Sequence, residues 1–249
     1  MGDIGQDDRE PLARSRMNTF KVVSDLICPW CYIGKRRLEA ALRELPSEAE
    51  VSVSWHPFQL NPEMPFQGMD RNEYRLRKFG DPANCQMRDA QLTEVGRTVG
   101  IEFRLDLQSN TPNTFDSHRV IWLAGQLGMQ DAVVEALFRA YFCEGVNFSS
   151  TANLIEVAAS AGLDAGRLER LLVSDEGTVE VQSEEREIKS LGISSVPLFI
   201  IQDRVAVSGA QPPEILLRAL EQTKELVPKR RSATRESFRP NRGVKGCKV

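Results

Sequence analysis

The sequence has few of the residues that build metal sites and disulfide-linked folds. Histidine occurs only at His56 and His118, and the 249 residues contain five cysteines. An odd cysteine count with a single close pair argues against a structural disulfide framework. A zinc site normally takes four ligands, and no second close cysteine pair is present to complete one. We therefore expect no metal site, and we expect a reducing compartment.

Long apolar runs and a strong charge of one sign are also missing. No stretch approaches the roughly 18 apolar residues that span a membrane. Residues 1–17 are polar and charged, unlike a secretory signal. The formal net charge of −3 gives no general reason to expect nucleic acid as a partner. We expect a soluble cytoplasmic protein without a membrane partner.

No Gly/Ser-rich linker and no internal repeat divides the chain. We interpret residues 1–17 as a mobile leader and residues 227–249, which are basic and contain Cys247, as a disordered tail. For the tail, a solvated chain is favoured over a nuclear-import signal or a site for an acidic partner, because basic runs are common and weakly specific.

The hydrophobic pattern between these ends predicts an α/β fold. Strands over Phe20–Ile27 and from Val51 flank a helix over 32–45, and strands over Pro197–Ile201 and Arg204–Ser208 precede a helix that starts at Pro213. Residues 63–187 read as successive helices. We predict one domain built from residues 18–62 and 188–226, with 63–187 as an all-helical insertion between its β-α-β and β-β-α halves.

A Cys-Pro-Trp-Cys sequence joins the first strand to its helix. Cys28 then stands at a helix N-terminus, where unpaired N–H groups and the helix dipole stabilise a thiolate. Cys31 lies on the same face of the first turn, close enough to attack a mixed disulfide formed at Cys28. Pro29 and Trp30, between the thiols, are expected to influence their redox balance. Redox chemistry is favoured over half a zinc site or two ordinary buried thiols.

Several single residues carry weaker signals. Asp25 is equally compatible with proton transfer to and from the thiols and with a strand-end or capping role. Lys35, one turn after Cys31, could favour a thiolate, but a solvated lysine is the favoured interpretation. His118 shares a helical stripe with Phe115, which favours a hydrogen-bonded core histidine over a catalytic one. Structural roles are also favoured for His56, Cys85 and Cys143.

Four sequence blocks stand in a recognisable order. They are Ser24–Gly34, Trp55–Pro62, Asn113–Arg119 and Gly192–Phe199. With these blocks the chain resembles the FrnE-like branch of the DsbA family over roughly residues 18–226. The resemblance implies a thioredoxin fold with a helical insertion, disulfide oxidoreductase activity and a cis-proline at Pro197 that faces the dithiol.

The same resemblance suggests which residues contact the substrate. A cis bond before Pro197 would leave the Val196 backbone free to pair with an extended peptide or with glutathione. We therefore name Pro29, Trp30, Ser195, Val196 and Pro197 as substrate-binding candidates. The resemblance also places the helix headed by Asn113 and Phe115 beside the cleft, which adds these two residues and His118.

The sequence thus predicts a thiol-disulfide oxidoreductase that acts on a disulfide-bearing protein or on glutathione. No tightly bound cofactor is expected, and glutathione is a candidate co-substrate. The alternative is a glutathione-dependent isomerase or transferase for a small aromatic or electrophilic molecule. This alternative is based on the similarity to 2-hydroxychromene-2-carboxylate isomerase and the kappa-class glutathione transferases. In those enzymes a serine replaces the first cysteine. A third possibility is a binding or chaperone-like module whose thiols are secondary.

Overall fold

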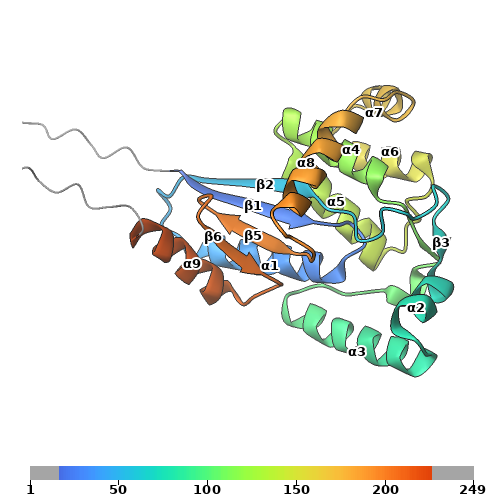
Figure 1. Ribbon diagram of the computed structural model, residues 1–249, viewed down its shortest axis with the longest axis horizontal. Helices are drawn as coiled ribbons and strands as arrows, with labels where there is room; N and C mark the ends of the chain where they lie inside the picture. Colours follow the sequence, from blue (N-terminus) through green and yellow to red (C-terminus); the bar gives the residue numbers. More distant parts are fainter. Residues whose placement is uncertain (1–16, 226–249) are drawn as a thin grey trace, which may run out of the picture.

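A four-stranded mixed sheet forms the centre of the computed structural model, which describes residues 17–225 (Figure 1). Its strands are β1 (Asn18–Ser24), β2 (Val51–Pro57), β5 (Leu198–Ile201) and β6 (Val205–Ser208). They lie in the order β2-β1-β5-β6, with β1 parallel to β2 and antiparallel to β5, and β5 antiparallel to β6. The predicted α/β fold, with β-α-β and β-β-α halves that share one sheet, is confirmed.

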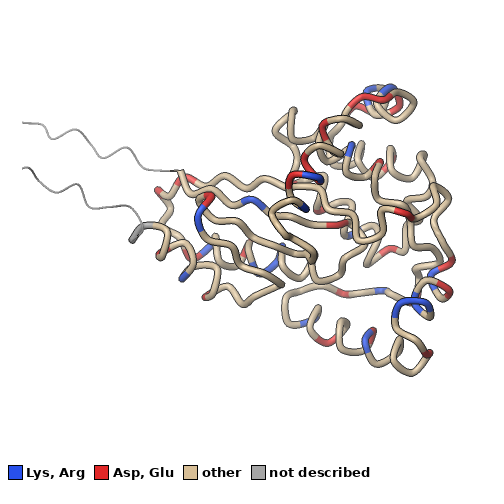
Figure 2. The backbone as a smooth tube through the Cα atoms, in the orientation of Figure 1, with Lys and Arg blue, Asp and Glu red and all other residues tan. Residues whose placement is uncertain are grey.

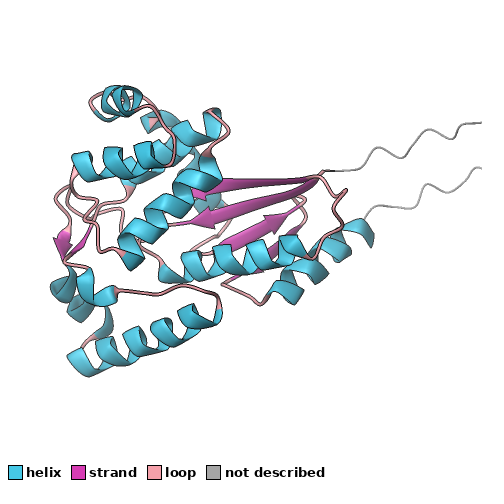
Figure 3. Ribbon diagram, turned by 180° about the vertical axis from the view of Figure 1, so that it is seen from behind, coloured by secondary structure: helices cyan, strands magenta, loops and turns pink. Residues whose placement is uncertain are grey.

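Helices cover both faces of this sheet. Helices α1 (Pro29–Arg43) and α9 (Pro213–Glu225) lie side by side on one face, and α8 (Thr178–Ser190) lies on the other (Figures 1 and 3). The side chains of β1 are divided between these two faces. Phe20 and Val22 enter the main core with α1 and α9. Val23 instead enters a smaller cluster that includes Ile188 of α8. Both sides of β1 are therefore buried, as expected for a central strand.

The segment between β2 and α8 is mostly helical. It contains α2 (Arg71–Phe79), α3 (Pro82–Thr98), α4 (Phe115–Gln126), α5 (Gln130–Cys143), α6 (Thr151–Ser160), α7 (Ala165–Leu172) and a short 3-10 helix, Leu105–Leu107. It also contains an antiparallel pair, β3 (Met69–Asp70) and β4 (Asn110–Thr111), so the expectation of an all-helical insertion was wrong in this detail. Strands of two residues are too short to show a hydrophobic period.

Side-chain caps explain where several of these helices begin. Asp70, Asp81, Ser150 and Asp164 each accept a hydrogen bond from a backbone N–H in the first helical turn. The cap at Asp81 is followed by a proline, Pro82, at the first helical position. Helix α3 therefore starts at Pro82, directly after its cap.

The insertion is anchored on the edge strand β2 and on α1. The Gln130 side chain accepts a hydrogen bond from the Trp55 N–H (2.8 Å) and donates one to the Trp55 carbonyl (2.9 Å), which pairs the open edge of β2. Tyr32 of α1 stacks on Phe138 of α5 with ring centroids 5.3 Å apart. These contacts fix α5 against β2 and against α1, the helix that begins at the dithiol.

Residues 227–249, the predicted tail with Cys247, and the predicted leader apart from Met17 lie outside the described residues. Within residues 17–225 no helix combines the length and apolar character needed to cross a membrane. Acidic and basic residues are interspersed over this part of the chain and do not gather at one end (Figure 2).

Candidate active site

Cys28 occupies the N-cap of α1, where the chain leaves the sheet. Strand β1 ends at Ser24, earlier than predicted, because residues 25–27 turn and the Cys28 N–H donates to the Asp25 carbonyl over 3.0 Å. Cys28 has extended backbone angles, Pro29 follows at the start of the helix, and no side chain caps the first turn. The sulfur of Cys28 therefore stands at a helix N-terminus, an environment that stabilises negative charge.

Cys31 lies one turn further on and is more deeply buried. Its side chain is 0% exposed, compared with 6% for Cys28, and both cysteines are free thiols. Burial raises the pKa of Cys31 well above its usual value, and a hydrogen bond and the charge of Cys28 raise it further. A proton therefore stays on the Cys31 sulfur more readily than in water, which separates the two thiols into different roles.

The loop before β5 lies opposite Cys28. The Val196–Pro197 peptide bond is cis, and the Cys28 thiol donates to the Val196 carbonyl with 3.7 Å between sulfur and oxygen. Ser195 is exposed, Val196 is half-buried and Pro197 is buried. The structure thus brings this loop to the first cysteine. Next to that cysteine, Trp30 is 36% exposed.

Gly34 lets α1 approach this loop closely. A Cβ atom at residue 34 would lie 3.0 Å from the Phe199 ring and 3.1 Å from the Pro197 ring, both tighter than ordinary van der Waals contact. A residue with a side chain would therefore push α1 and the loop apart. Gly34 belongs to the first of the four sequence blocks, but nothing in the sequence indicated this contact.

Asp25 and His118 form a buried pair behind the dithiol. They are 0% and 3% exposed, and His118 Nε2 lies 3.5 Å from Asp25 Oδ1. The other carboxylate oxygen accepts a hydrogen bond from the Leu60 N–H over 2.8 Å. The sequence analysis considered Asp25 and His118 separately and did not predict their contact. Their contact joins the β1–α1 turn to α4 and depends on tertiary packing alone.

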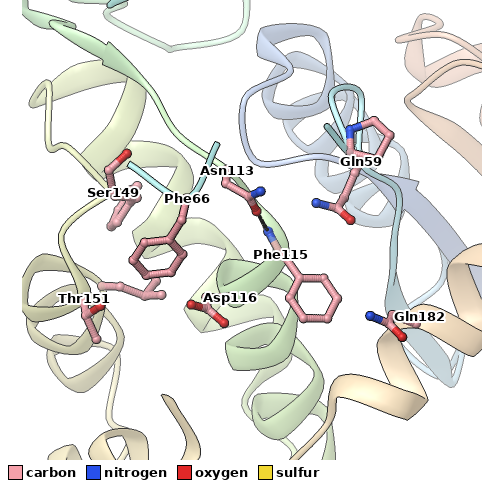
Figure 4. A pocket seen from close by; sticks show the side chains of 11 residues that line it. Gln59, Phe66, Asn113, Phe115, Asp116, Ser149, Thr151 and Gln182 are labelled. Carbon is pink, nitrogen blue, oxygen red and sulfur yellow. Dashed lines mark hydrogen bonds between the residues drawn. The ribbon is translucent and has the colours of Figure 1, made fainter. Parts of the chain in front are cut away.

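Asn113 and Phe115 line a cavity of about 310 Å³ (Figure 4). The Asn113 side chain donates to the Met64 carbonyl (2.7 Å) and accepts from the Phe115 N–H (2.9 Å), so its polar atoms are occupied by backbone groups. Both polar side chains, such as Gln59, and apolar ones, such as Phe66 and Phe148, complete the lining. Neither cysteine lines this cavity, and neither does the Val196–Pro197 segment. The predicted site residues therefore fall into two groups.

Lys35 is not solvated, so the favoured interpretation of this residue was wrong. Its side chain is 2% exposed, and its ammonium group pairs with Glu39, with Asp131 at 3.2 Å and with Glu135 at 3.1 Å. These carboxylates raise the pKa of Lys35 although burial opposes them. Two of the three come from α5, nearly a hundred residues later, which the sequence pattern around Lys35 could not show.

The remaining histidine and cysteines take part in packing. His56 contacts Ser54 over 2.8 Å and pairs with Glu184, which ties β2 to α8. Cys85 and Cys143 are half-buried free thiols, each apart from the Cys28–Cys31 pair. Among residues 17–225 no group of three or more His, Cys, Asp or Glu side chains is arranged to hold a metal ion.

Comparisons with known proteins agree with this architecture. A Bacillus subtilis protein named YwbO, itself uncharacterized, is 27% identical over 202 residues, which are 81% of this chain and 94% of YwbO. The crystal structure of a probable DsbA oxidoreductase from Streptomyces coelicolor is 31% identical, with a TM-score of 0.78 over 84% of this chain and 91% of that one.

A more distant structure shares the fold. The cytosolic disulfide reductase DsbM from Pseudomonas aeruginosa, solved with glutathione, is 21% identical with a TM-score of 0.56, over 84% of this chain and all of DsbM. The model of the DSBA-like thioredoxin domain matches residues 19–221, which include both cysteines and the Val196–Pro197 loop. The chain therefore belongs to the family of DsbA-like thioredoxin-domain proteins.

Proposed function

We propose that the protein is a thiol-disulfide oxidoreductase that exchanges the Cys28–Cys31 dithiol with the disulfide of a protein or of glutathione. Cys28, as thiolate, attacks one substrate sulfur, forms a mixed disulfide and expels the other sulfur as a thiolate that takes a proton. Cys31 then loses its proton, bonds to Cys28 and expels the second substrate thiol. Two electrons pass from the dithiol to the substrate, and the reverse sequence oxidises a substrate dithiol.

The arrangement of the two thiols is the observation that carries this proposal. Cys28 stands at the helix N-cap and is the more accessible thiol, whereas Cys31 is fully buried directly behind it with its pKa raised. A pair with one reactive sulfur and one protonated, shielded sulfur suits sequential attack and resolution. We also propose the cytoplasm as the protein's location, because an odd number of cysteines with a single close pair favours a reducing compartment.

The Val196 backbone is the proposed docking point for the substrate. Its carbonyl already contacts the Cys28 sulfur, and the exposed Ser195 beside it leaves room for an extended chain. A peptide or glutathione that lies along residues 195–197 would place its sulfur at Cys28. Trp30 offers an exposed aromatic surface next to the same sulfur.

Trapping tests this scheme. The variant Cys31→Ser cannot resolve a mixed disulfide, so incubation with glutathione disulfide should accumulate one glutathione on Cys28, identified by peptide mass spectrometry. The matched controls Cys85→Ser and Cys143→Ser keep both active thiols and should accumulate none there. If Cys28 is shown to be reactive in Cys31→Ser but forms no adduct with glutathione, the two-thiol scheme is refuted.

The cavity beside α4 favours a second candidate, a glutathione-dependent isomerase or transferase. Its volume of about 310 Å³ and the rings of Phe66 and Phe115 suit a small aromatic molecule (Figure 4). In that reaction bound glutathione supplies the sulfur, so Cys28→Ser should keep most of the activity. The oxidoreductase proposal requires Cys28→Ser to be inactive, which separates the two candidates.

A further inference from the structure

We propose that Ser54, His56 and Glu184 form a second active site, which cleaves small carboxylic esters with Ser54 as the nucleophile. The three side chains meet where β2, α4 and α8 pack together (Figure 1). They line a cavity that includes neither cysteine of the dithiol and no residue of the Val196–Pro197 loop. This site is therefore independent of the thiol-disulfide function, and either proposal can fail without the other.

The geometry of β2 brings Ser54 and His56 together. They are two residues apart in the strand, so their side chains lie on the same face of it. Ser54 Oγ lies 2.8 Å from His56 Nε2. The other ring nitrogen, Nδ1, is hydrogen-bonded to the carboxylate of Glu184, which comes from α8. The three side chains thus form a hydrogen-bonded chain in the order serine, imidazole, carboxylate.

The carboxylate fixes the direction of both hydrogen bonds. An ionised carboxylate can only accept, so Nδ1 of His56 carries the hydrogen that is donated to Glu184. In the neutral ring Nε2 is then an acceptor, and the Ser54 hydroxyl donates to it. In this arrangement a histidine takes the proton of a serine that attacks a carbonyl carbon. The carboxylate stabilises the imidazolium that results.

The three groups can be reached from solvent. The side chains of His56 and Glu184 are 20% and 35% exposed, and Ser54 is half-buried. The cavity in front of them has a volume of about 260 Å³, and Ile121 and Trp122 give it apolar walls. This volume is below the range that is usual for drug-sized ligands. It suits an ester of a short acyl chain and a small alcohol.

Donors for the developing negative charge lie in the same cavity. Cleavage of an ester places this charge on the carbonyl oxygen, which needs an N–H or O–H donor. Trp122 and Gln126, both of α4, line the cavity and carry an indole N–H and an amide N–H. The amide of Gln130 is instead held by the carbonyls of Trp55 and Ile121. Donation to the oxyanion therefore falls to Trp122 or Gln126.

The reaction is an acyl transfer in two steps. Ser54 Oγ bonds to the carbonyl carbon and its proton passes to His56 Nε2. The bond to the alcohol oxygen breaks, and the alcohol leaves with that proton. A water molecule then gives a proton to His56 and attacks the acyl carbon, which releases the carboxylic acid and returns the proton to Ser54. No electrons are transferred, so the dithiol takes no part.

Covalent labelling of the wild-type chain tests the nucleophile. With diisopropyl fluorophosphate, the oxygen of an activated serine bonds to phosphorus and fluoride leaves. Peptide mass spectrometry should find one adduct on Ser54, and this adduct should be absent from His56→Gln. Ser52 lies on the same face of β2 two residues earlier and serves as the internal control, which should stay unlabelled. A wild-type chain without an adduct on Ser54 would overturn the proposal.

Hydrolysis of p-nitrophenyl acetate tests the reaction. Because a thiolate also cleaves activated esters, the five cysteines are first replaced by alanine in the full chain. This protein should release nitrophenol faster than buffer alone, with saturation. In the same background Ser54→Ala should fall to the buffer rate and His56→Gln should lose at least about a hundredfold in kcat. The control Ser52→Ala should cleave the ester at the unsubstituted rate.

Glu184→Gln tests the third member of the chain. A glutamine amide can donate to Nδ1, which places the ring hydrogen on Nε2 and removes the acceptor for the Ser54 hydroxyl. The kcat should fall about tenfold to a hundredfold while KM changes by less than about twofold. Glu187→Gln, at an exposed position of the same helix, should change neither. A purely structural tie between β2 and α8 would not produce this split.

The losses should not add, because the groups act as a unit. Ser54→Ala combined with His56→Gln should be no slower than Ser54→Ala alone. Ester cleavage at the unsubstituted rate in Ser54→Ala would overturn the proposal, and so would a folded cysteine-free protein that cleaves no ester. If His56→Gln or the cysteine-free chain does not fold, labelling of Ser54 in the wild-type chain decides the question.

Discussion

Replacing Gly34 with alanine tests whether α1 must pack closely on the Val196–Pro197 loop. The new Cβ would lie 3.0 Å from the Phe199 ring and 3.1 Å from the Pro197 ring. Both distances fall roughly 0.4–0.5 Å short of a normal carbon–carbon contact of about 3.5 Å. Phe199 belongs to β5, which is paired on both sides in the sheet, so its backbone resists displacement. We expect the loop that holds Pro197 to move instead.

Two opposing terms set the stability of Gly34→Ala. Overpacking typically costs about 1–3 kcal/mol, whereas alanine in place of glycine inside a helix returns about 1 kcal/mol. The free energy of unfolding should therefore fall by about 0–2 kcal/mol. The control Gly166→Ala lies in α7, where the new Cβ meets its nearest neighbour at 3.4 Å. It should be neutral or stabilising in urea unfolding.

The functional effect should exceed the effect on stability. A loop displaced by a few tenths of an ångström misaligns the docking point beside the Cys28 sulfur, now 3.7 Å from the Val196 carbonyl. Exchange with a peptide disulfide should slow about tenfold, while alkylation of Cys28 by iodoacetamide changes by less than about twofold. If Gly34→Ala exchanges peptide disulfides at the wild-type rate, close packing of the loop is not required and the docking argument fails.

Two further predictions concern buried charges. Lys35→Met should lower the free energy of unfolding by about 2 kcal/mol, less than the 3–5 kcal/mol for breaking a fully buried pair, because its carboxylate partners are partly exposed. As a control, Arg97→Ala at an exposed position should show no comparable loss of unfolding free energy in urea. If the alkylation rate of Cys28 changes in Lys35→Met, Lys35 acts on the thiols and its role is more than structural. The raised pKa of Cys31 means that the unfolded chain loses this proton first as pH rises. The reduced protein should thus lose stability above about pH 9, by about 1.4 kcal/mol per pH unit for this proton, until the native thiol ionises. Unfolding curves of Cys31→Ser should lack this contribution but should keep the alkaline loss of stability due to Tyr141, whose pKa is also raised. If the free energy of unfolding of Cys31→Ser falls with pH as steeply as that of the wild type, the assignment to Cys31 is contradicted.

Much of the fold was predictable because it depends on local patterns. The apolar, β-branched run around Val22 and the Cys-Pro-Trp-Cys turn mark a strand followed by a helix, and both appear in the structure. The order of β-α-β, helices and β-β-α also follows from hydrophobic period and turn residues. The short pair β3–β4 was missed because two residues carry no period.

The site was predictable only where its residues are neighbours in sequence. Cys28 and Cys31 share one helical turn, so their spacing alone brings them together. The burial of Lys35 depends on carboxylates of α5, and the partner of Asp25 lies in α4. Such contacts are set by how the insertion packs on α1 and β2. The spacing of residues along the chain therefore does not predict these contacts.

Equilibration with glutathione tests the central claim most directly. The reduced protein is incubated in buffers of increasing glutathione disulfide to glutathione ratio, quenched with acid and analysed by mass spectrometry. The account predicts a two-electron transition from the dithiol to a Cys28–Cys31 disulfide, with a mass lower by two hydrogen atoms, that is abolished in Cys28→Ser. A protein that takes up only stable glutathione adducts, or whose Cys28 and Cys31 stay reduced at every ratio, would contradict it.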